Sequence, residues 1–148
     1  MNGWLLDTNV LSELRRQKPE KEVLNFIAEK SLESLFVSAI SLAEIRFGIE
    51  MVTDVQNREL LTEWLTHRVR PMFEGRVLPV SEDVMFRWRV LVEEGRKIGH
   101  TFSQPDLMIA ATALDHGLTM VTRNTSDFER TNALLINPWK LEGKSKRA

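Results

Sequence analysis

Short apolar runs alternate with longer amphipathic stretches along this chain. Runs with the length and composition of β-strands lie at residues 3–6, 35–38, 76–80, 118–122 and 134–136. Helical patterns lie between them, at residues 42–52, 58–69, 81–97 and 105–114. Pro105 is placed to open the last of these helices, and Gly117 to end it. Strands separated by helices predict an α/β fold, a three-layer α/β/α sandwich with a mostly parallel sheet of about five strands.

The composition is that of one ordinary globular domain. The chain has 148 residues, of which 43% are hydrophobic and 28% charged. We expect a single domain over residues 1–140 and a basic polar tail at 141–148 that frays. The absence of cysteine excludes disulfides, thiolate zinc sites and thiol nucleophiles, and it suits a cytoplasmic protein. No signal peptide is visible, and no apolar stretch approaches the roughly 20 residues needed to span a membrane.

The net charge of −1 gives no basic surplus of the kind that marks many nucleic-acid-binding proteins. Basic residues nevertheless cluster locally, at 15–18, 68–70, 87–89 and 96–97. Each cluster taken alone is more often a solvated helix face than a phosphate contact. A near-neutral total can still conceal a basic groove if the acids are concentrated elsewhere.

Four acids stand at element boundaries, namely Asp7, Glu44, Asp106 and Asp127. Asp7 ends the apolar run of WLLDTN, Glu44 begins the helix after the second strand, and Asp127 lies just past the fourth. Because the carboxyl ends of parallel strands share one edge of the sheet, these three can converge there. Asp106 opens the helix that leads into the fourth strand, so it joins them only if that helix start lies across the same edge.

Each acid also has a purely structural interpretation. Asp7 can cap the helix that follows it. Ser41 with Glu44, and Ser103 with Asp106, have the spacing of capping boxes. The fourth acid can interact with a helix dipole. Caps are commoner than active sites, so these interpretations stay open for each acid by itself.

If the four acids meet, their mutual repulsion forces either protonation or a bound cation. Two unit charges about 4 Å apart repel by roughly 4 kcal/mol at an effective dielectric constant near 20. The three histidines, His67, His100 and His116, lie in helical or loop segments away from the acids. A site with oxygen ligands alone favours Mg²⁺ or Mn²⁺, which position phosphates and activate water for in-line attack.

Other chemistries lack their motifs in this sequence. It has no G-x-x-x-x-G-K-[ST] or G-x-G-x-x-G loop for nucleotides and no G-x-S-x-G elbow for a serine nucleophile. Nothing marks a sugar cleft for carboxylate glycosidase chemistry. An aspartyl-phosphate enzyme would need a second acid soon after Asp7, where the chain has Thr8 and Asn9.

Four segments in order resemble a known family. LLDTNVLSEL, SAISLAEIRFGI, PDLMIAATAL and TMVTRNTSDFE are similar to blocks of the PIN-domain toxins, the VapC ribonucleases of type II toxin–antitoxin modules. The closing Asn137-Pro138-Trp139 resembles the FitB branch most. The resemblance extends from residue 4 to about residue 139, and four ordered blocks are a far more specific signal than one.

The resemblance implies an α/β/α PIN domain and a Mg²⁺- or Mn²⁺-dependent endoribonuclease. Asp7, Glu44 and Asp106 match the first three acids of the family. Relatives place the fourth acid at the position of either Asn124 or Asp127, and here only Asp127 is ionisable. We expect all four acids, Asp7, Glu44, Asp106 and Asp127, to be catalytic and to bind the metal.

Neighbouring polar residues fit a supporting role in such a site. Side chains that can hold the carboxylates at fixed angles are Thr8, Asn9, Ser41, Thr122 and Asn124. Their alternative role as caps and turn residues does not exclude this one. Arg123 is a candidate contact to RNA phosphates.

The resemblance also implies partners. They are an RNA substrate, a second copy of the chain in a homodimer, and a small cognate VapB- or FitA-like antitoxin that inserts an arginine among the acids. Trp64, Phe73 or Trp88 could grip that antitoxin if exposed, and operator DNA would bind only through it. Two rival functions remain open. One is a structure-specific DNA nuclease with the same acids, and the other a non-catalytic subunit of a DNA-binding repressor complex.

Overall fold

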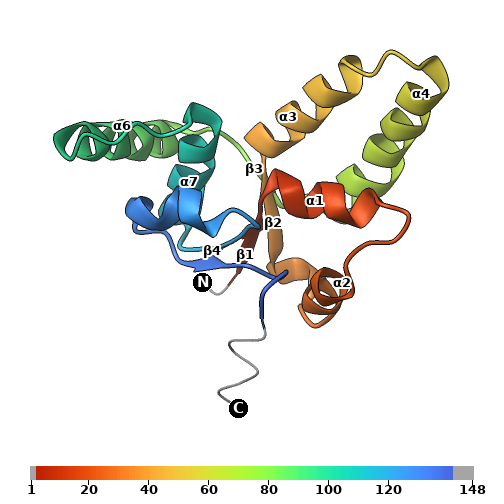
Figure 1. Ribbon diagram of the computed structural model, residues 1–148, viewed down its shortest axis with the longest axis horizontal. Coiled ribbons are helices and arrows are strands. Elements are labelled where there is room, and N and C mark those ends of the chain that lie inside the picture. The colour runs from red at the N-terminus through yellow and green to blue at the C-terminus, as the bar shows by residue number, and fades with distance from the viewer. Residues whose placement is uncertain (1–2, 142–148) are drawn as a thin grey trace.

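A computed structural model describes residues 3–141 and contains a five-stranded sheet between helical layers (Figure 1). The strands are β1 (Trp4–Leu6), β2 (Leu35–Ser38), β3 (Val77–Leu78), β4 (Thr119–Val121) and β5 (Leu135–Ile136). The α-helices are α1 (Thr8–Arg15), α2 (Lys21–Ala28), α3 (Ala39–Glu50), α4 (Val55–Trp64), α5 (Arg70–Met72), α6 (Glu82–Lys97) and α7 (Gln104–His116). Two 3-10 helices, η1 (Leu32–Ser34) and η3 (Thr125–Thr131), and one π-helix, η2 (Leu65–Val69), complete the described elements.

The strand order is β3-β2-β1-β4-β5, and every pairing in the sheet is parallel. The α/β prediction with about five parallel strands is therefore confirmed. The chain builds from β1 outward to β2 and β3, and then returns to add β4 on the other side of β1. The order thus reverses between β1 and β4, which is where ligands bind in open parallel sheets.

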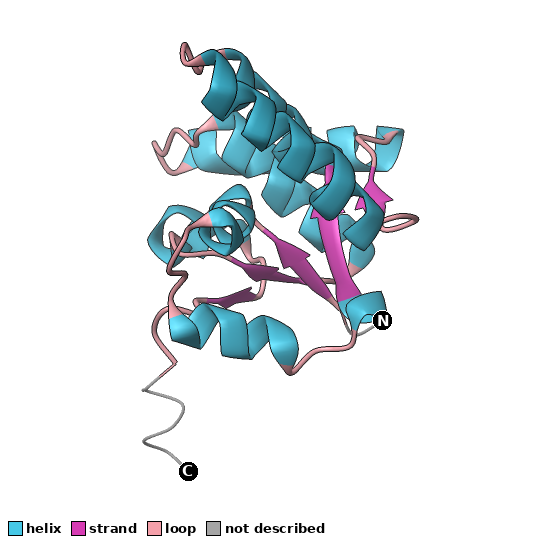
Figure 2. Cartoon of the chain, turned by 90° about the vertical axis from the view of Figure 1, so that its right-hand side faces the viewer, coloured by secondary structure: helices cyan, strands magenta, loops and turns pink. Residues whose placement is uncertain are grey.

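Strand β1 is covered on both faces, which explains its unbroken apolar sequence. Leu6 packs into a core with α1, α2 and the end of α4, whereas Leu5 packs against α7 and β4. Both leucines are fully buried. Helices lie on the two faces of the sheet (Figure 2), so the three-layer arrangement follows from alternating side chains of one strand.

Two pairs of helices diverge beyond the sheet (Figure 1). Helix α6 packs along α7 on one side, while α3 and α4 extend on the other. Helix α1 starts directly after β1, near the centre of the molecule, and runs beneath the α3–α4 arm (Figure 1). The carboxyl ends of β1 and β4 therefore open between the two helical arms.

The helices differ from the sequence pattern at α2, α3 and α4. Helix α4 starts at Val55, before the predicted residue 58, and ends at Trp64, where the π-helical η2 takes over. Helix α2 was not predicted, because it is only eight residues long and its N-cap residue, Glu20, makes no side-chain cap. Helix α3 begins at Ala39, earlier than its apolar stripe suggested. The single domain over residues 1–140 stays a prediction, and the tail lies outside the described residues apart from Leu141. Among residues 3–141, no helix has the length and apolar character needed to cross a membrane.

Candidate active site

The candidate site forms at the carboxyl ends of β1 and β4. Asp7 follows β1, and its backbone N–H donates to the carbonyl of Val121 at 2.9 Å, which extends the β1–β4 ladder by one step. Thr122 follows β4 on the adjacent strand. The two polar residues that directly follow these neighbouring buried strands thus lie side by side, at the point where the strand order reverses.

Three groups hold the Asp7 carboxylate. The backbone N–H of Thr8 donates to Oδ1 at 2.7 Å, and the hydroxyl of the fully buried Thr122 donates to Oδ2 at 2.8 Å. Asn9 adds a longer bond to Oδ2 at 3.4 Å and also donates to the Thr122 hydroxyl. Asp7 is the N-cap of α1 as well, so the capping role and the site role belong to the same side chain.

Thr8 joins two of the acids. Its backbone binds Asp7, and its hydroxyl donates to Oε1 of Glu44 at 2.9 Å across 36 positions of sequence. Glu44 lies in α3 and is exposed. One residue in the first turn of α1 therefore fixes both the buried and the exposed acid.

Asp106 lies in the first turn of α7, close enough to affect the titration of Asp7. Burial raises the pKa of Asp7 from an ordinary 3.8 to about 6. The hydrogen bonds from Thr122 and Thr8 oppose this rise in the pKa, and the charges of Asp106 and Glu44 add to it. The start of α7 thus lies across the sheet edge that holds Asp7.

The pKa of Asp106 is raised as well, first by burial and then by the charges of Glu44 and Asp127. A hydrogen bond with the Ser103 side chain opposes the rise in the pKa. Asp127 lies in η3 and is exposed. The four sequence-predicted acids are therefore one electrostatic group, with Asp7 at its buried end and Asp127 at its outer edge.

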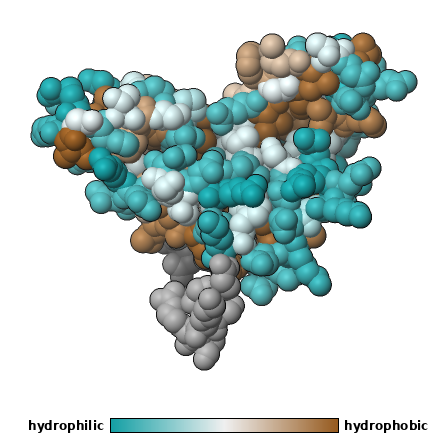
Figure 3. All heavy atoms as spheres, viewed as in Figure 1, coloured by the Kyte–Doolittle hydropathy of each residue, from teal (hydrophilic) through white to brown (hydrophobic). Residues whose placement is uncertain are grey.

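A pocket of about 530 Å³ opens over these acids. Its lining residues are Asp7, Thr8, Asn9, Ser12, Glu13, Arg15, Arg16, Glu44, Asp106, Arg123, Asn124 and Trp139. Of the predicted acids, only Asp127 is missing from this lining. The pocket therefore has an acidic floor and a wall with three arginines, and Figure 3 shows a largely hydrophilic face below the two arms.

Glu13 and Trp139 also line the pocket, although the sequence alone did not mark them as site residues. Glu13 is buried and accepts from the backbone N–H of Glu20 at 2.8 Å and from the Arg16 guanidinium. Burial would raise the pKa of Glu13, but these hydrogen bonds outweigh it and lower the pKa. The signal that the sequence offered was weak: Glu13 lies between Ser12 and Leu14, close to the apolar Val10 and Leu11.

The comparisons with known proteins agree on one family. The sequence model of the PIN domain matches residues 4–134. The chain belongs to the PIN-domain family. It is 38% identical to VapC ribonuclease Y4jK of Sinorhizobium fredii over 92% of this chain and 97% of that protein. It is 36% identical to toxin FitB of Neisseria gonorrhoeae over 91% of this chain and 97% of FitB.

Solved structures show the same relationship. The crystal structure of FitAcB from Neisseria gonorrhoeae superposes with a TM-score of 0.88 at 36% identity and covers 93% of this chain and 99% of its own. The FitAB structure bound to the IR36 DNA fragment gives a TM-score of 0.87 at 34% identity and covers 93% of this chain and 96% of its own. The resemblance to VapC-type toxins is thereby confirmed for the sequence and for the fold.

Three sequence-based interpretations are corrected in this PIN domain. Ser41 is not an N-cap, because α3 starts at Ala39 and the Ser38 hydroxyl accepts from the backbone N–H of Ser41 at 3.1 Å. The capping box of Ser41 and Glu44 is therefore wrong. The Ser103 side chain caps no backbone N–H and instead bonds Asp106. Phe73 is fully buried, so it cannot contact a partner.

The other residues that the sequence pointed to have different surroundings in the structure. The Thr122 hydroxyl accepts from the backbone N–H of Asn124 at 3.1 Å, and Asn124 lines the pocket. Ser41 is fully buried, and its hydroxyl has no hydrogen-bond partner among the described residues. The partly buried Trp64 and Trp88 pack against the core on α4 and α6.

The donor set of this PIN domain fits a hard divalent cation. All acids of the site offer oxygen, and two of them have raised pKa values that a cation would relieve. In residues 3–141, no three histidine or acidic side chains form a ready-made metal cage. Such a closed cage is not what Mg²⁺ needs, because it keeps several waters and uses one or two carboxylates.

Proposed function

We propose that this PIN domain, a VapC-type toxin ribonuclease, cleaves RNA as a Mg²⁺- or Mn²⁺-dependent endonuclease through Asp7, Glu44, Asp106 and Asp127. The observation that carries the proposal is that Asp7, Glu44 and Asp106 line one pocket, where burial first, and then the charges of the neighbouring acids, raise the pKa of Asp7 and of Asp106. A buried carboxylate such as Asp7 beside other acids costs stability, and a catalytic cation explains why the chain retains it.

The residues have distinct roles in this proposal. Asp7 and Asp106 would hold the cation, which supplies charge to the phosphate oxygens and makes a nearby water more acidic. Thr8 and Thr122 keep the Asp7 carboxylate at a fixed angle, since both donate to it. Glu44, exposed and oriented by Thr8, accepts the proton of the attacking water, with Asp127 orienting that water from the outer edge.

The experiment is cleavage of matched RNA and DNA hairpins with Mg²⁺ and with EDTA. We expect RNA cleavage only with Mg²⁺, and its loss in Asp7→Asn. Asp83→Asn is the matched control, because Asp83 is an exposed acid on α6 outside the acidic pocket. Cleavage of DNA alone would favour the rival DNA nuclease, and no cleavage of either hairpin would favour the non-catalytic subunit.

We further propose that the protein acts in the cytoplasm, where a small antitoxin silences the site and carries any contact with operator DNA. The relatives FitAcB and FitAB have been solved as complexes, one of them with DNA. An arginine from the antitoxin would pair with the acidic floor in a forked geometry. Co-expression with a VapB- or FitA-like antitoxin should abolish RNA cleavage.

The homodimer is proposed on an apolar surface beside Glu44. A pocket of about 540 Å³ between α3 and α7 is lined mainly by apolar residues, with Ile40, Phe47 and Met108 among them. Phe47 is 67% exposed, and apolar atoms gather along the α3–α4 arm in Figure 3. Phe47→Glu should give a monomer by light scattering, whereas Phe86→Glu, an equally exposed phenylalanine on α6, should leave the dimer intact.

A further inference from the structure

The turn after β5 is tied to the loop after β4 by side-chain and backbone bonds. The Asn137 amide donates to the Arg123 carbonyl at 3.1 Å, and its oxygen accepts from the Trp139 backbone N–H at 2.9 Å. On the other side of this loop, the Arg123 backbone N–H donates to the side chain of Asn9 at 3.3 Å. The Asn-Pro-Trp segment, which the cleavage chemistry does not use, therefore fixes the backbone at Arg123.

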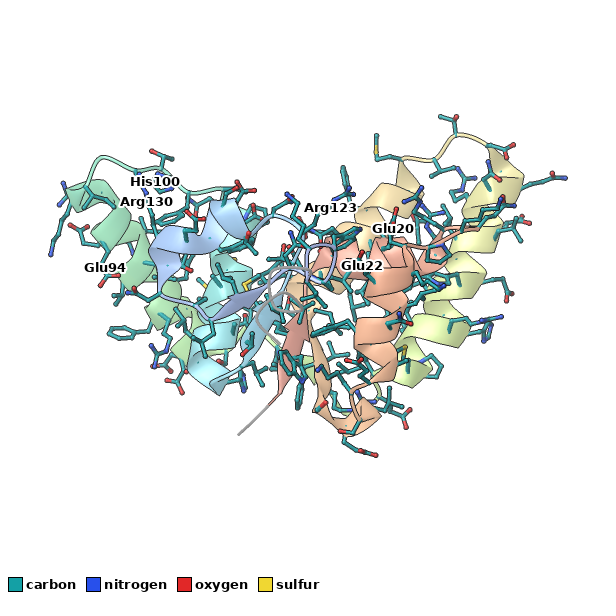
Figure 4. All side chains as sticks on the ribbon, turned by 60° about the horizontal axis from the view of Figure 1, so that its bottom comes forward. Glu20, Glu22, Glu94, His100, Arg123 and Arg130 are labelled. Atoms are coloured by element: carbon teal, nitrogen blue, oxygen red, sulfur yellow. The ribbon has the colours of Figure 1, made fainter. Side chains whose placement is uncertain are left out.

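The two side chains of this junction face each other at the acidic pocket. The Arg123 guanidinium lies 5.2 Å from the centre of a Trp139 ring, and both residues line the pocket with Asp7. Figure 4 places Arg123 near the middle of the molecule, between the helical arms. A guanidinium stacked on an indole uses its flat face, which leaves the N–H groups on its edge free to donate.

The positive charge of Arg123 is available for a ligand. Among residues 3–141, no carboxylate lies within 4.0 Å of its guanidinium, although its charge contributes to the low pKa of Glu13. Arg16, in contrast, is paired with Glu13 at 3.2 Å. Arg123 is also exposed, so a phosphate can approach it from solvent.

Trp139 has features that packing alone does not require. The indole packs against the core, which fixes the ring, but its buried Nε1 has no hydrogen-bond partner in the described part of the chain. A phenylalanine would cover the same core without leaving a donor unpaired. Tryptophan is, however, the best aromatic platform for a cation.

We propose that Trp139 is a positioning residue that holds Arg123 at the pocket mouth, where the guanidinium binds an RNA phosphate next to the one that is cleaved. This inference rests on the proposed ribonuclease function. It identifies a contact that positions the RNA strand, and it gives the Asn137-Pro138-Trp139 segment a role. Losing the contact should weaken the affinity for RNA and leave the rate of the chemical step unchanged, because Arg123 contacts a phosphate that is not cleaved.

The first experiment measures RNA cleavage kinetics across a salt series. We expect Arg123→Ala to raise KM roughly tenfold with kcat within about twofold, and to make the slope of log KM against log salt shallower by about 0.7, the value for one phosphate contact on a single strand. Trp139→Leu should reproduce most of this rise in KM, and Trp139→Phe should restore KM to within about threefold of the original. The double variant of Arg123 and Trp139 should be no worse than Arg123→Ala.

The matched control is a second arginine–tryptophan pair outside the pocket. Arg89 lies 5.8 Å from the centre of a Trp88 ring on α6. Arg89→Ala should leave KM and the salt slope unchanged. If Trp139→Leu does not fold, Arg123→Lys decides the question, because it keeps the charge but stacks poorly. It should raise KM about three- to fivefold at an unchanged salt slope.

A second measurement does not depend on cleavage. The Asp7→Asn background in EDTA binds a short fluorescein-labelled single-stranded RNA, and fluorescence anisotropy should show the same weakening for Arg123→Ala and Trp139→Leu. If the chain cleaves no RNA but this pattern holds, the phosphate contact stands and the ribonuclease proposal fails. The inference is overturned if Trp139→Leu or Arg123→Lys behaves as the parent protein, or if the Trp139 and Arg123 effects multiply in the double variant.

Discussion

The buried acid Asp7 should destabilise the protein at neutral pH. Its pKa is raised from 3.8 to about 6 in the folded chain, first by burial. A carboxyl group whose pKa is higher in the folded chain than in the unfolded chain is less stable as an ion when folded. It therefore lowers the free energy of unfolding above pH 6. This penalty shrinks as the pH falls from 6 toward 3.8 and is absent below that value. A shift of this size corresponds to roughly 3 kcal/mol.

Asp7→Asn removes the ionised group and therefore should stabilise the fold. The amide still accepts from the Thr8 backbone N–H, but it loses the hydroxyl bond from Thr122, which costs about 1 kcal/mol. The net gain is then about 2 kcal/mol at pH 8. At pH 4.5 the linkage relation leaves only about 1 kcal/mol of the penalty, so the variant and the parent should be equally stable.

The assay is urea unfolding followed by circular dichroism at both pH values, in EDTA. A gain of about 2 kcal/mol should move the midpoint by roughly 1 M urea at pH 8. Glu59→Gln, an exposed acid on α4, is the control and should change stability by no more than about 0.5 kcal/mol at either pH. If Asp7→Asn were no more stable than the parent at pH 8, or if its gain did not depend on pH, the conclusion that the buried Asp7 carboxylate destabilises the fold would be refuted.

Three further outcomes follow from the structure. Mg²⁺ at 100 times its Kd should stabilise the parent by about 2.7 kcal/mol, and Asp106→Asn should remove most of this gain in a thermal melt. Glu13→Gln should lower stability by roughly 1 kcal/mol at pH 7. This loss should shrink as the pH falls below 4.5 toward the lowered pKa of Glu13, because the hydrogen bonds stabilise only the ionised form. Gly48→Ala, in open space on α3, should stabilise the fold by up to about 1 kcal/mol. Gly95→Ala should destabilise the fold by about 1–3 kcal/mol, because the new Cβ would lie 2.8 Å from the carbonyl oxygen of His100. Urea unfolding midpoints measure both effects.

The sheet was predictable because a strand that is buried on both faces needs apolar side chains at consecutive positions. Leu5 and Leu6 are apolar neighbours since each faces a different helical layer. The start of α3 was not predictable in the same way. Ser38 and Ser41 are both acceptable N-caps, and only the end of β2 at Ser38 decides between them.

The site was partly predictable for a related reason. Asp7 and Glu44 follow strands, so the topology of a parallel sheet brings them to one edge. The place of Asp106 depends on how α7 packs against α6 and the sheet, and the contact of Trp139 with Arg123 joins two loops at adjacent strands. Such contacts arise from tertiary packing and leave no periodic signal in the sequence.

The structural and the catalytic interpretations of Asp7 turn out to depend on each other. Burial and the charges of Asp106 and Glu44 all raise the pKa of Asp7, and the cap bond from Thr8 and the hydroxyl bond from Thr122 oppose them. The balance is a pKa of about 6, so the carboxylate is largely ionised at pH 7 and can take a cation without first losing a proton. Without the cap bond from Thr8, the pKa of Asp7 would lie higher and a larger fraction of the acid would be protonated at pH 7. The cap therefore supports the proposed metal site and is not an alternative to it.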